Sequence, residues 1–202
     1  MTDAGSPYAR ALGDRIAQLS PALQRYFDTI PDGFVGRGEG VFDRVGSRRR
    51  VLAPLLRWFA DRGVVPAGWH EGVPFRIENR TLDGVAVAVR RFDLPTGAFT
   101  MHDAVRATPL GTVVDRVGRP PRVAVEFTVH VAGGALELHS VAVGIRLGHL
   151  RLRLPRWAAP RIRLRERSAG DRQRVEFTMD LPLIGRVYEY AGTFDYRIEE
   201  DR

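Results

Sequence analysis

Apolar and polar residues alternate with a period of two from about Gly72 to the end of this 202-residue chain. Such alternation is typical of β-strands that bury one face and expose the other. Turn signals such as Asp83-Gly84, Gly133-Gly134 and Gly170-Asp171 interrupt it at short intervals, so neighbouring strands must run antiparallel. Strands are expected at 73–80, 84–94, 98–105, 111–117, 122–131, 135–147, 149–154, 161–167, 173–181 and 186–198.

Roughly ten consecutive strands constrain the fold strongly, because few helices remain to cover a flat sheet. A strongly curved sheet or a closed barrel removes exposed strand edges, and it can enclose a cavity. The predicted fold class is therefore mainly β (α+β), a curved antiparallel sheet or closed β-barrel with two or three N-terminal helices.

The N-terminal part carries helix signals that the rest of the chain lacks. Ser6-Pro7 and Ser20-Pro21 each combine a serine N-cap with proline at the first helical position. Apolar residues at helical spacing predict helices over 7–19 and 49–61, and Gly63 ends the second one.

The stretch Phe34 to Val45 between these helices is strand-like and rich in glycine. Gly36, Gly38 and Gly40 indicate bends or the close approach of another part of the chain. With 44% hydrophobic residues, the whole chain is long enough for one sizeable core and short for two.

We therefore expect a single domain over 1–202. A helical and strand segment, 1–65, would pack on an antiparallel barrel formed by 72–198, with the helices at 7–19 and 49–61 packed against or across one end of it. Homodimer formation is left open.

Two absences exclude whole classes of chemistry. The chain contains no cysteine, which excludes disulfides, thiolate nucleophiles and iron–sulfur clusters. All 31 basic residues are arginines, so mechanisms that need a lysine amine, such as Schiff-base and pyridoxal-phosphate chemistry, are excluded as well. We expect no cofactor and no metal.

The formal net charge of +7 raises the question of nucleic-acid binding. The arginines alternate with apolar residues along the strands, as on a solvated face, so no nucleic-acid partner is expected. Residues Met1 to Gly5 lack the basic and apolar regions of a signal peptide, and no stretch approaches the roughly 20 apolar residues of a membrane span. A cytoplasmic location is the resulting expectation.

Short motifs in the C-terminal half and near the N-terminus form a pattern that spans nearly the whole chain. They are Leu150-Arg151-Leu152-Arg153-Leu154-Pro155, Ala159-Pro160, Arg174-Val175-Glu176-Phe177, Leu181-Pro182-Leu183-Ile184-Gly185, Tyr188-Glu189-Tyr190-Ala191-Gly192, Leu19-Ser20-Pro21-Ala22-Leu23 and Leu52-Ala53-Pro54-Leu55-Leu56. The pattern resembles a bacterial family catalogued as domain-of-unknown-function family 4166.

Members of that family are often attached to NAD-binding reductase-like or membrane domains, and the family has no catalytic signature that can be transferred to this chain. This chain shows no such attachment and no GxGxxG motif after a strand, so we expect a stand-alone member. Arginine in place of lysine is typical of a GC-rich, actinobacterial genome, where a stand-alone copy suggests recruitment to a biosynthetic pathway.

The last two predicted strands each sort into an aromatic face and a charged face. The inward set, which predicts a ligand-binding lining, is Phe177, Met179, Tyr188, Tyr190, Phe194 and Tyr196. Three tyrosines on one face are unusual for a dry core, because each hydroxyl needs a partner. The alternative is that the tyrosines reach the rim of the barrel or one another.

Glu166 follows Ile162 and Leu164 on the apolar face of the strand 161–167. Burial disfavours the charged form of a carboxylate, which is the usual way in which a general acid or base is tuned. Glu166 is therefore a candidate catalytic residue, and Tyr190, a hydroxyl on the inward aromatic face, is the second candidate. The alternative is that Glu166 is solvated near Ser168 or pairs with an inward arginine.

A second polar set lies on the hairpin that turns at Gly133-Gly134. If these glycines are the turn residues, Thr128 lies opposite His139 and His130 opposite Glu137, and Glu126 shares their face. Such side chains could bind a divalent metal. The other face is an ordinary apolar core, so a solvated outer surface is the expected outcome.

Three functions fit these observations. The first is a cofactor-independent cyclase or isomerase that encloses an apolar, polyketide-like or lipid-like substrate and acts through shape and a few polar groups. The second is a non-catalytic binding or carrier module for a hydrophobic ligand. The third is an interaction domain of an oxidoreductase system.

Overall fold

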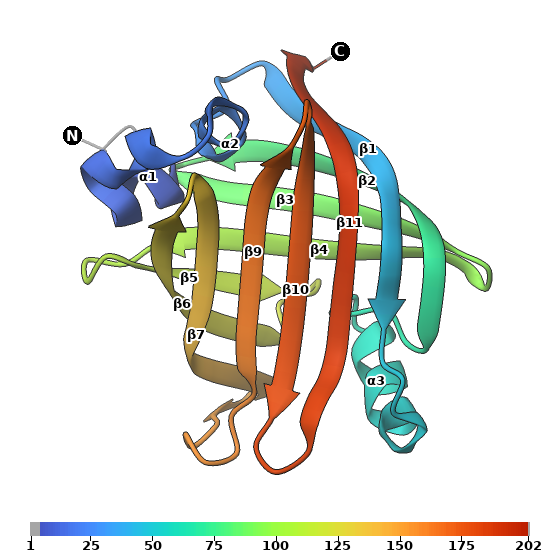
Figure 1. Cartoon of the computed structure of the whole chain (residues 1–202). Coiled ribbons are helices and arrows are strands. Elements are labelled where there is room, and N and C mark those ends of the chain that lie inside the picture. Colours follow the sequence, from blue (N-terminus) through green and yellow to red (C-terminus); the bar gives the residue numbers. More distant parts are fainter. Residues whose placement is uncertain (1–4, 202) are drawn as a thin grey trace.

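The strands close into a barrel in the computed structural model, which describes residues 5–201 (Figure 1). The strands are β1 Phe34–Gly46, β2 Trp69–Leu82, β3 Val85–Leu94, β4 Gly97–Ala107, β5 Thr112–Val117, β6 Val123–Ala132, β7 Ala135–Leu147, β8 Leu150–Arg153, β9 Arg161–Ala169, β10 Arg172–Leu181 and β11 Gly185–Glu200. Ten of them follow the order β6-β5-β4-β3-β2-β1-β11-β10-β9-β7, and pairing of β6 with β7 closes the ring. The extra strand β8 pairs with β7 alone. The predicted fold class is confirmed.

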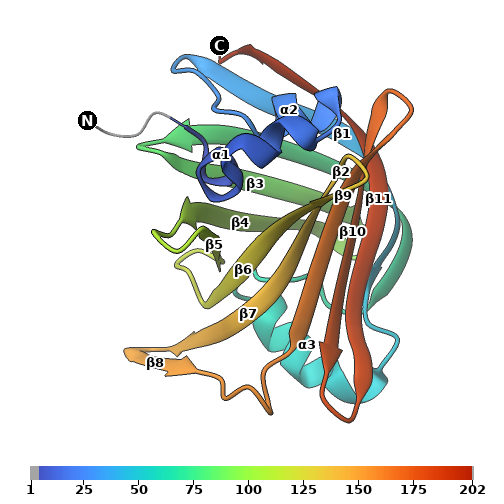
Figure 2. The same cartoon turned by 60° about the vertical axis from the view of Figure 1, so that its left-hand side comes forward.

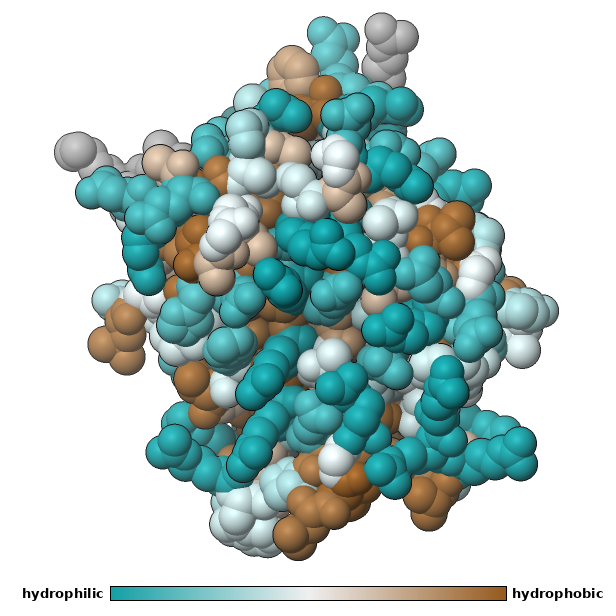
Figure 3. All heavy atoms as spheres, viewed as in Figure 1, coloured by the Kyte–Doolittle hydropathy of each residue, from teal (hydrophilic) through white to brown (hydrophobic). Residues whose placement is uncertain are grey.

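The barrel is flattened, with two groups of strands facing each other. Strands β9, β10, β11 and β1 run vertically at the front of Figure 1. Strands β2 to β4 lie behind them and run roughly horizontally (Figure 1). Inward side chains of both groups meet between them and form the core. The outer face of β9 to β11 is mainly hydrophilic (Figure 3).

Three short helices accompany the barrel: α1 Pro7–Leu12, α2 Pro21–Phe27 and α3 Ala53–Ala60. The Ser6 hydroxyl accepts a hydrogen bond from the Ala9 amide at 3.0 Å, which confirms the predicted cap of α1. The predicted helix over 7–19 divides into α1 and a 3₁₀ segment, Gly13–Gln18.

The prediction that both helical segments lie at one end of the barrel is wrong. Helices α1 and α2 lie at one end and α3 near the other (Figures 1 and 2). The Ser20 amide donates to the Gly134 carbonyl at 3.0 Å, and the Ser20 and Ser168 hydroxyls lie 2.6 Å apart, so α2 is fastened to the β6–β7 and β9–β10 turns. Helix α3 lies in the connection between the end of β1 and the start of β2. This connection is at the end of the barrel opposite to α1 and α2 (Figures 1 and 2).

Glycines on β1 and β11 make room for large rings from the neighbouring strand. A Cβ at Gly36 would lie 1.7 Å from the Tyr196 hydroxyl oxygen, and a Cβ at Gly192 would lie 2.6 Å from the Phe42 Cα. No other residue type fits at either position without displacing the ring or the strand. The glycine-rich pattern of β1 thus reflects close approach, as expected.

No helix among residues 5–201 has the length and apolar character needed to cross a membrane. Residues 1–4, on which most of the signal-peptide argument depends, lie outside the described part of the chain.

Replacing Phe194 by alanine is expected to destabilise the protein by about 3–5 kcal/mol, the usual cost of truncating a buried phenylalanine. The Phe194 ring is 2% exposed and packs on Phe75 and Tyr26, with ring centroids 5.6 and 5.9 Å away. Urea unfolding measures the loss, and Trp157→Ala is the control because Trp157 is 79% exposed. A loss below about 1 kcal/mol would contradict a tightly packed core at this position.

Candidate functional site

In the part of the chain that the structure describes, three small cavities of about 90, 40 and 10 Å³ border the interior of the barrel, and the second of them lies at the end covered by α1 and α2. Arg90 of β3 and Glu166 of β9 line all three. These two side chains reach the centre from opposite groups of strands, because β3 belongs to the rear group and β9 to the front group (Figure 1). Polar chemistry in the interior is therefore concentrated around Arg90 and Glu166.

Glu166 is buried because β9 alternates regularly. Ile162, Leu164 and Glu166 face inward, and Glu166 lies opposite Val175 of β10, as the predicted hairpin requires. The amide of Gln173 donates a hydrogen bond to its carboxylate. Burial raises the pKa of Glu166 to about 7, although Arg90 and the Gln173 hydrogen bond act in the opposite direction. A carboxyl of this kind can accept and return a proton near neutral pH.

Arg90 forms an ion pair and hydrogen bond with Asp103 on the adjacent strand β4. The Asp103 side chain is 2% exposed and that of Arg90 19% exposed, so solvent screens this pair weakly. A buried guanidinium requires such a partner, because isolated charges are strongly disfavoured away from water.

Asp115 on β5 adds a third carboxyl to the interior. Burial and the nearby charge of Asp103 raise the pKa of Asp115 to about 7, against the effect of Arg90 and a backbone hydrogen bond from Ala104. Within the described chain, Arg90 is the only cationic side chain on the 90 Å³ cavity. Asp103 already neutralises it, so deprotonation of Asp115 or Glu166 leaves net negative charge in the interior.

The six residues predicted as a ligand lining fall into different parts of the interior. Phe177, Met179 and Tyr190 line the 90 Å³ cavity, and Tyr190 and Phe194 line the 10 Å³ cavity. The Tyr190 ring stacks on Phe177 at 4.6 Å, and no hydrogen bond is formed by the Tyr190 hydroxyl within residues 5–201.

The other two tyrosines lie away from these cavities. Tyr196 packs edge-on against Tyr26 at 4.6 Å and accepts a hydrogen bond from the Asn79 amide at 3.4 Å. Tyr188 is 1% exposed, and its hydroxyl has no partner among the described residues. A role for either residue in ligand binding stays a prediction.

The sequence contained signals for Arg90, Asp103 and Asp115 that the period-two reasoning missed. Each occupies an inward position on its strand, between apolar neighbours such as Ala88 and Phe92 on either side of Arg90. This is the same signal that identified Glu166. Tyr8 and Tyr26 reach the cavities from α1 and α2, which strand periodicity does not predict.

The polar set on the β6–β7 hairpin has the predicted register, with Thr128 opposite His139 and His130 opposite Glu137. The rings of His130 and His139 lie 5.4 Å apart, and Glu137 pairs with His139 at 3.7 Å and with Arg165 at 3.3 Å. In the described part of the chain, no three histidine or acidic side chains gather closely enough to hold a metal ion.

The raised pKa of Glu166 predicts a pH-dependent stability. The folded state favours the protonated carboxyl, so its contribution is greatest below the ordinary pKa of 4.5, declines as the pH rises, and is lost above about 7. Between these values, the stability of the native protein relative to Glu166→Gln should fall by about 1.4 kcal/mol per pH unit. Urea unfolding of both proteins from pH 4.5 to 8 measures the difference, and a constant difference would contradict the buried carboxyl.

Comparison with known proteins identifies a family but no function. A search of the curated proteins finds no match. The crystal structure of Rv2717c from M. tuberculosis matches with a TM-score of 0.45 and 14% sequence identity, over 91% of this chain and 99% of that chain. The family model described as "Domain of unknown function (DUF4166)" matches residues 19–194, as the sequence motifs predict. The chain therefore belongs to the DUF4166 family.

Proposed function

We propose that the barrel interior binds a small, mainly apolar and uncharged molecule and catalyses a proton transfer on it, as a cofactor-independent isomerase or cyclase does. The observation that carries the proposal is the position of Glu166 at the junction of all three internal cavities, with a pKa raised to about 7. A perturbed carboxyl in a mainly apolar cavity is a typical feature of acid–base sites.

The charges of the interior argue against an acidic ligand. A carboxylate or phosphate would need a free cation, and Arg90 is already paired with Asp103. It would also approach Asp115 and Glu166, whose own charged forms burial disfavours. A neutral carbonyl, enol or hydroxyl avoids this cost, because it needs only a hydrogen bond.

The size of the interior favours a small molecule over a long chain. A cavity of about 90 Å³ is smaller than an engineered cavity of about 150 Å³ that holds benzene. A ring or short chain would fit if the unbranched side chains of Met101 and Met179, which line the cavity, change rotamer. A whole polyketide or fatty acyl chain requires a wider opening of the barrel.

Glu166 and Tyr190 have complementary roles in this proposal. The Glu166 carboxylate removes a proton from a carbon beside the substrate carbonyl, and the Tyr190 hydroxyl donates a hydrogen bond to the oxygen on which negative charge develops. Protonated Glu166 then returns the proton to another carbon, so the double bond moves and the composition of the substrate is unchanged. Both side chains line the 90 Å³ cavity.

Cyclohex-3-enone is a suitable probe, because its isomerisation to the conjugated enone is followed by ultraviolet absorbance. We expect the native protein to accelerate this reaction and Glu166→Gln to lower the rate by about 10²-fold or more, the usual contribution of a general base. Tyr190→Phe should lower the rate with little loss of stability. Tyr188→Phe is the matched control, because Tyr188 is buried beside Phe177 but lines none of the three cavities.

Binding without turnover would contradict the catalytic part of this proposal and favour a carrier. Calorimetry with phenol and benzoate tests the preference for a neutral ligand, because the two probes differ mainly in charge. Phenol is expected to bind more tightly than benzoate at pH 8. Equal binding, or binding that Glu166→Gln and Tyr190→Phe leave unchanged, would place the ligand outside this interior.

A further inference from the structure

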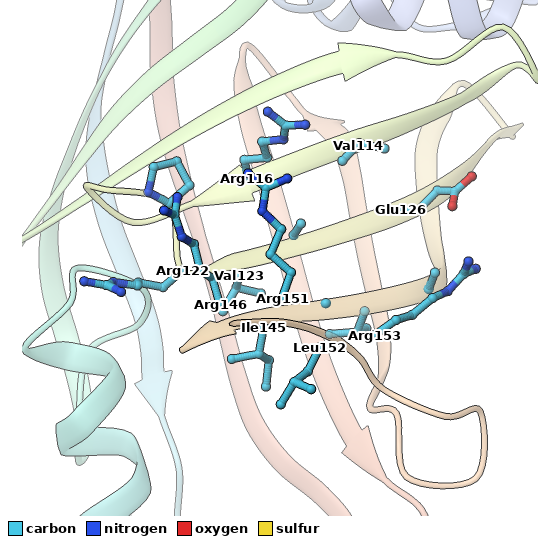
Figure 4. Close-up of a pocket in the computed structure, with 15 residues that line it drawn as sticks. Val114, Arg116, Arg122, Val123, Glu126, Ile145, Arg146, Arg151, Leu152 and Arg153 are labelled. Carbon is cyan, nitrogen blue, oxygen red and sulfur yellow. The ribbon is translucent and has the colours of Figure 1, made fainter. Parts of the chain in front are cut away.

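A groove of about 440 Å³ lies on the outside of the barrel, and none of the interior polar residues Arg90, Asp115 and Glu166 lines it. It extends over the outer faces of β5, β6 and β7 and under the arm formed by β8, which projects from the barrel (Figures 2 and 4). Five arginines line it: Arg116, Arg122, Arg146, Arg151 and Arg153. Its volume lies within the range of roughly 300–1,000 Å³ that is typical of small-molecule sites.

The five groove arginines lack acidic partners. No salt bridge within residues 5–201 involves any of them, whereas arginines of β1, β2, β10 and β11 pair widely with carboxylates. The one acidic residue of the groove, Glu126, accepts a hydrogen bond from the Thr112 hydroxyl at 2.9 Å. Positive charge is therefore uncompensated within the groove.

Two local features show that this arrangement is unfavourable without an anion. Arg146 and Arg151 are directly opposite each other on β7 and β8, and like charges in such a pair destabilise a sheet. The Nε of Arg122 is buried and has no hydrogen-bond partner in the described chain. A bound oxyanion would offset the repulsion and accept this hydrogen bond.

The floor of the groove is apolar and shallow. Val114, Ala124 and Ala142 point outward beneath the arginines, and Gly144 opposite Arg153 leaves the backbone uncovered. Ile145 and Leu152 extend to the other side of the β7–β8 ribbon, away from the groove arginines (Figure 4). The groove thus combines several guanidinium groups with a small patch of aliphatic surface.

From these observations we propose that the groove is a binding site for an organic diphosphate. The guanidinium groups of the five groove arginines, Arg122 included, hold the phosphate oxygens, and the aliphatic floor contacts the organic group. Arginine suits this role because its planar fork donates two parallel hydrogen bonds to phosphate. Several guanidiniums match the charge of two linked phosphates better than that of a single carboxylate.

The test is calorimetric titration with pyrophosphate and with isopentenyl diphosphate, using sulfate at equal ionic strength as the reference anion. Pyrophosphate is expected to bind with 1:1 stoichiometry and at least about tenfold more tightly than sulfate, and the ester more tightly still. Bound ligand should also raise the melting temperature through mass action. Equal affinity for pyrophosphate and sulfate would overturn the proposal, and equal affinity for ester and pyrophosphate would overturn the role of the floor.

Substitutions locate the site. The double variant Arg146→Gln/Arg151→Gln should weaken pyrophosphate binding at least about tenfold, while Arg25→Gln, an exposed arginine of α2, should not change it. If the double variant fails to fold, the pyrophosphate affinity of Arg153→Gln is measured instead, and it should also be weaker than that of the native protein. Unchanged affinity in a folded groove variant would refute the assignment.

Other sources of phosphate are distinguished by parallel measurements. Binding of the same protein to vesicles containing phosphatidate and to a duplex oligonucleotide is measured. Binding of either without binding of free pyrophosphate would overturn the small-molecule site in favour of a lipid or nucleic-acid surface. Because the groove arginines lie outside the barrel, failure of the isomerase assay leaves this test unaffected.

Discussion

The pairing of β6 with β7 is the contact on which the remaining structure depends, because it converts a curved sheet into a closed barrel. Closure shields most inward positions from water. Inward polar side chains must then find partners within the barrel or change protonation state. Arg90 and Asp103 find partners in each other. Burial instead favours the protonated forms of Glu166 and Asp115, whose pKa values are raised to about 7.

Desolvation decides the chemistry of the interior. Arg90 and the Gln173 amide both stabilise the Glu166 carboxylate, yet its pKa rises, because burial outweighs both. The same balance holds at Asp115. One guanidinium and three carboxyls therefore produce an interior that is close to neutral in acid and negative in base. A ligand that enters it experiences a charge that depends on the pH of the medium.

Much of the fold was predictable from the sequence, because strand periodicity and turn residues are local signals. The pairing next to the β6–β7 and β9–β10 turns follows from Gly133-Gly134 and Gly170-Asp171, although the β6–β7 register shifts farther along, between Glu126 and Phe127. Alternation fails where the register shifts between Met179 and Asp180. Near there Val187, which strict alternation places on the face opposite the inward Tyr188, is only 5% exposed. Periodicity has no means of predicting such a bulge.

The candidate site was predictable only in part. Glu166 and the face that carries Tyr190 follow from single strands. The meeting of Glu166 with Arg90 requires the closed ring, since the two residues lie on strands far apart in the sequence. Cavity volume depends on how side chains from both groups of strands fit together, and the N-terminal tyrosines enter through tertiary packing of α1 and α2.

The β8 arm has a consequence for how this molecule meets other chains. Among residues 5–201, strand β8 pairs with β7 on one side only, so its other side presents unpaired amide and carbonyl groups to solvent. Free strand edges of this kind recruit strands from neighbouring molecules. Arg151 and Arg153 place two positive charges on that short edge, and a second copy of the arm would bring the same charges against them. Electrostatic repulsion between identical arms therefore opposes edge-to-edge association into fibrils or swapped dimers.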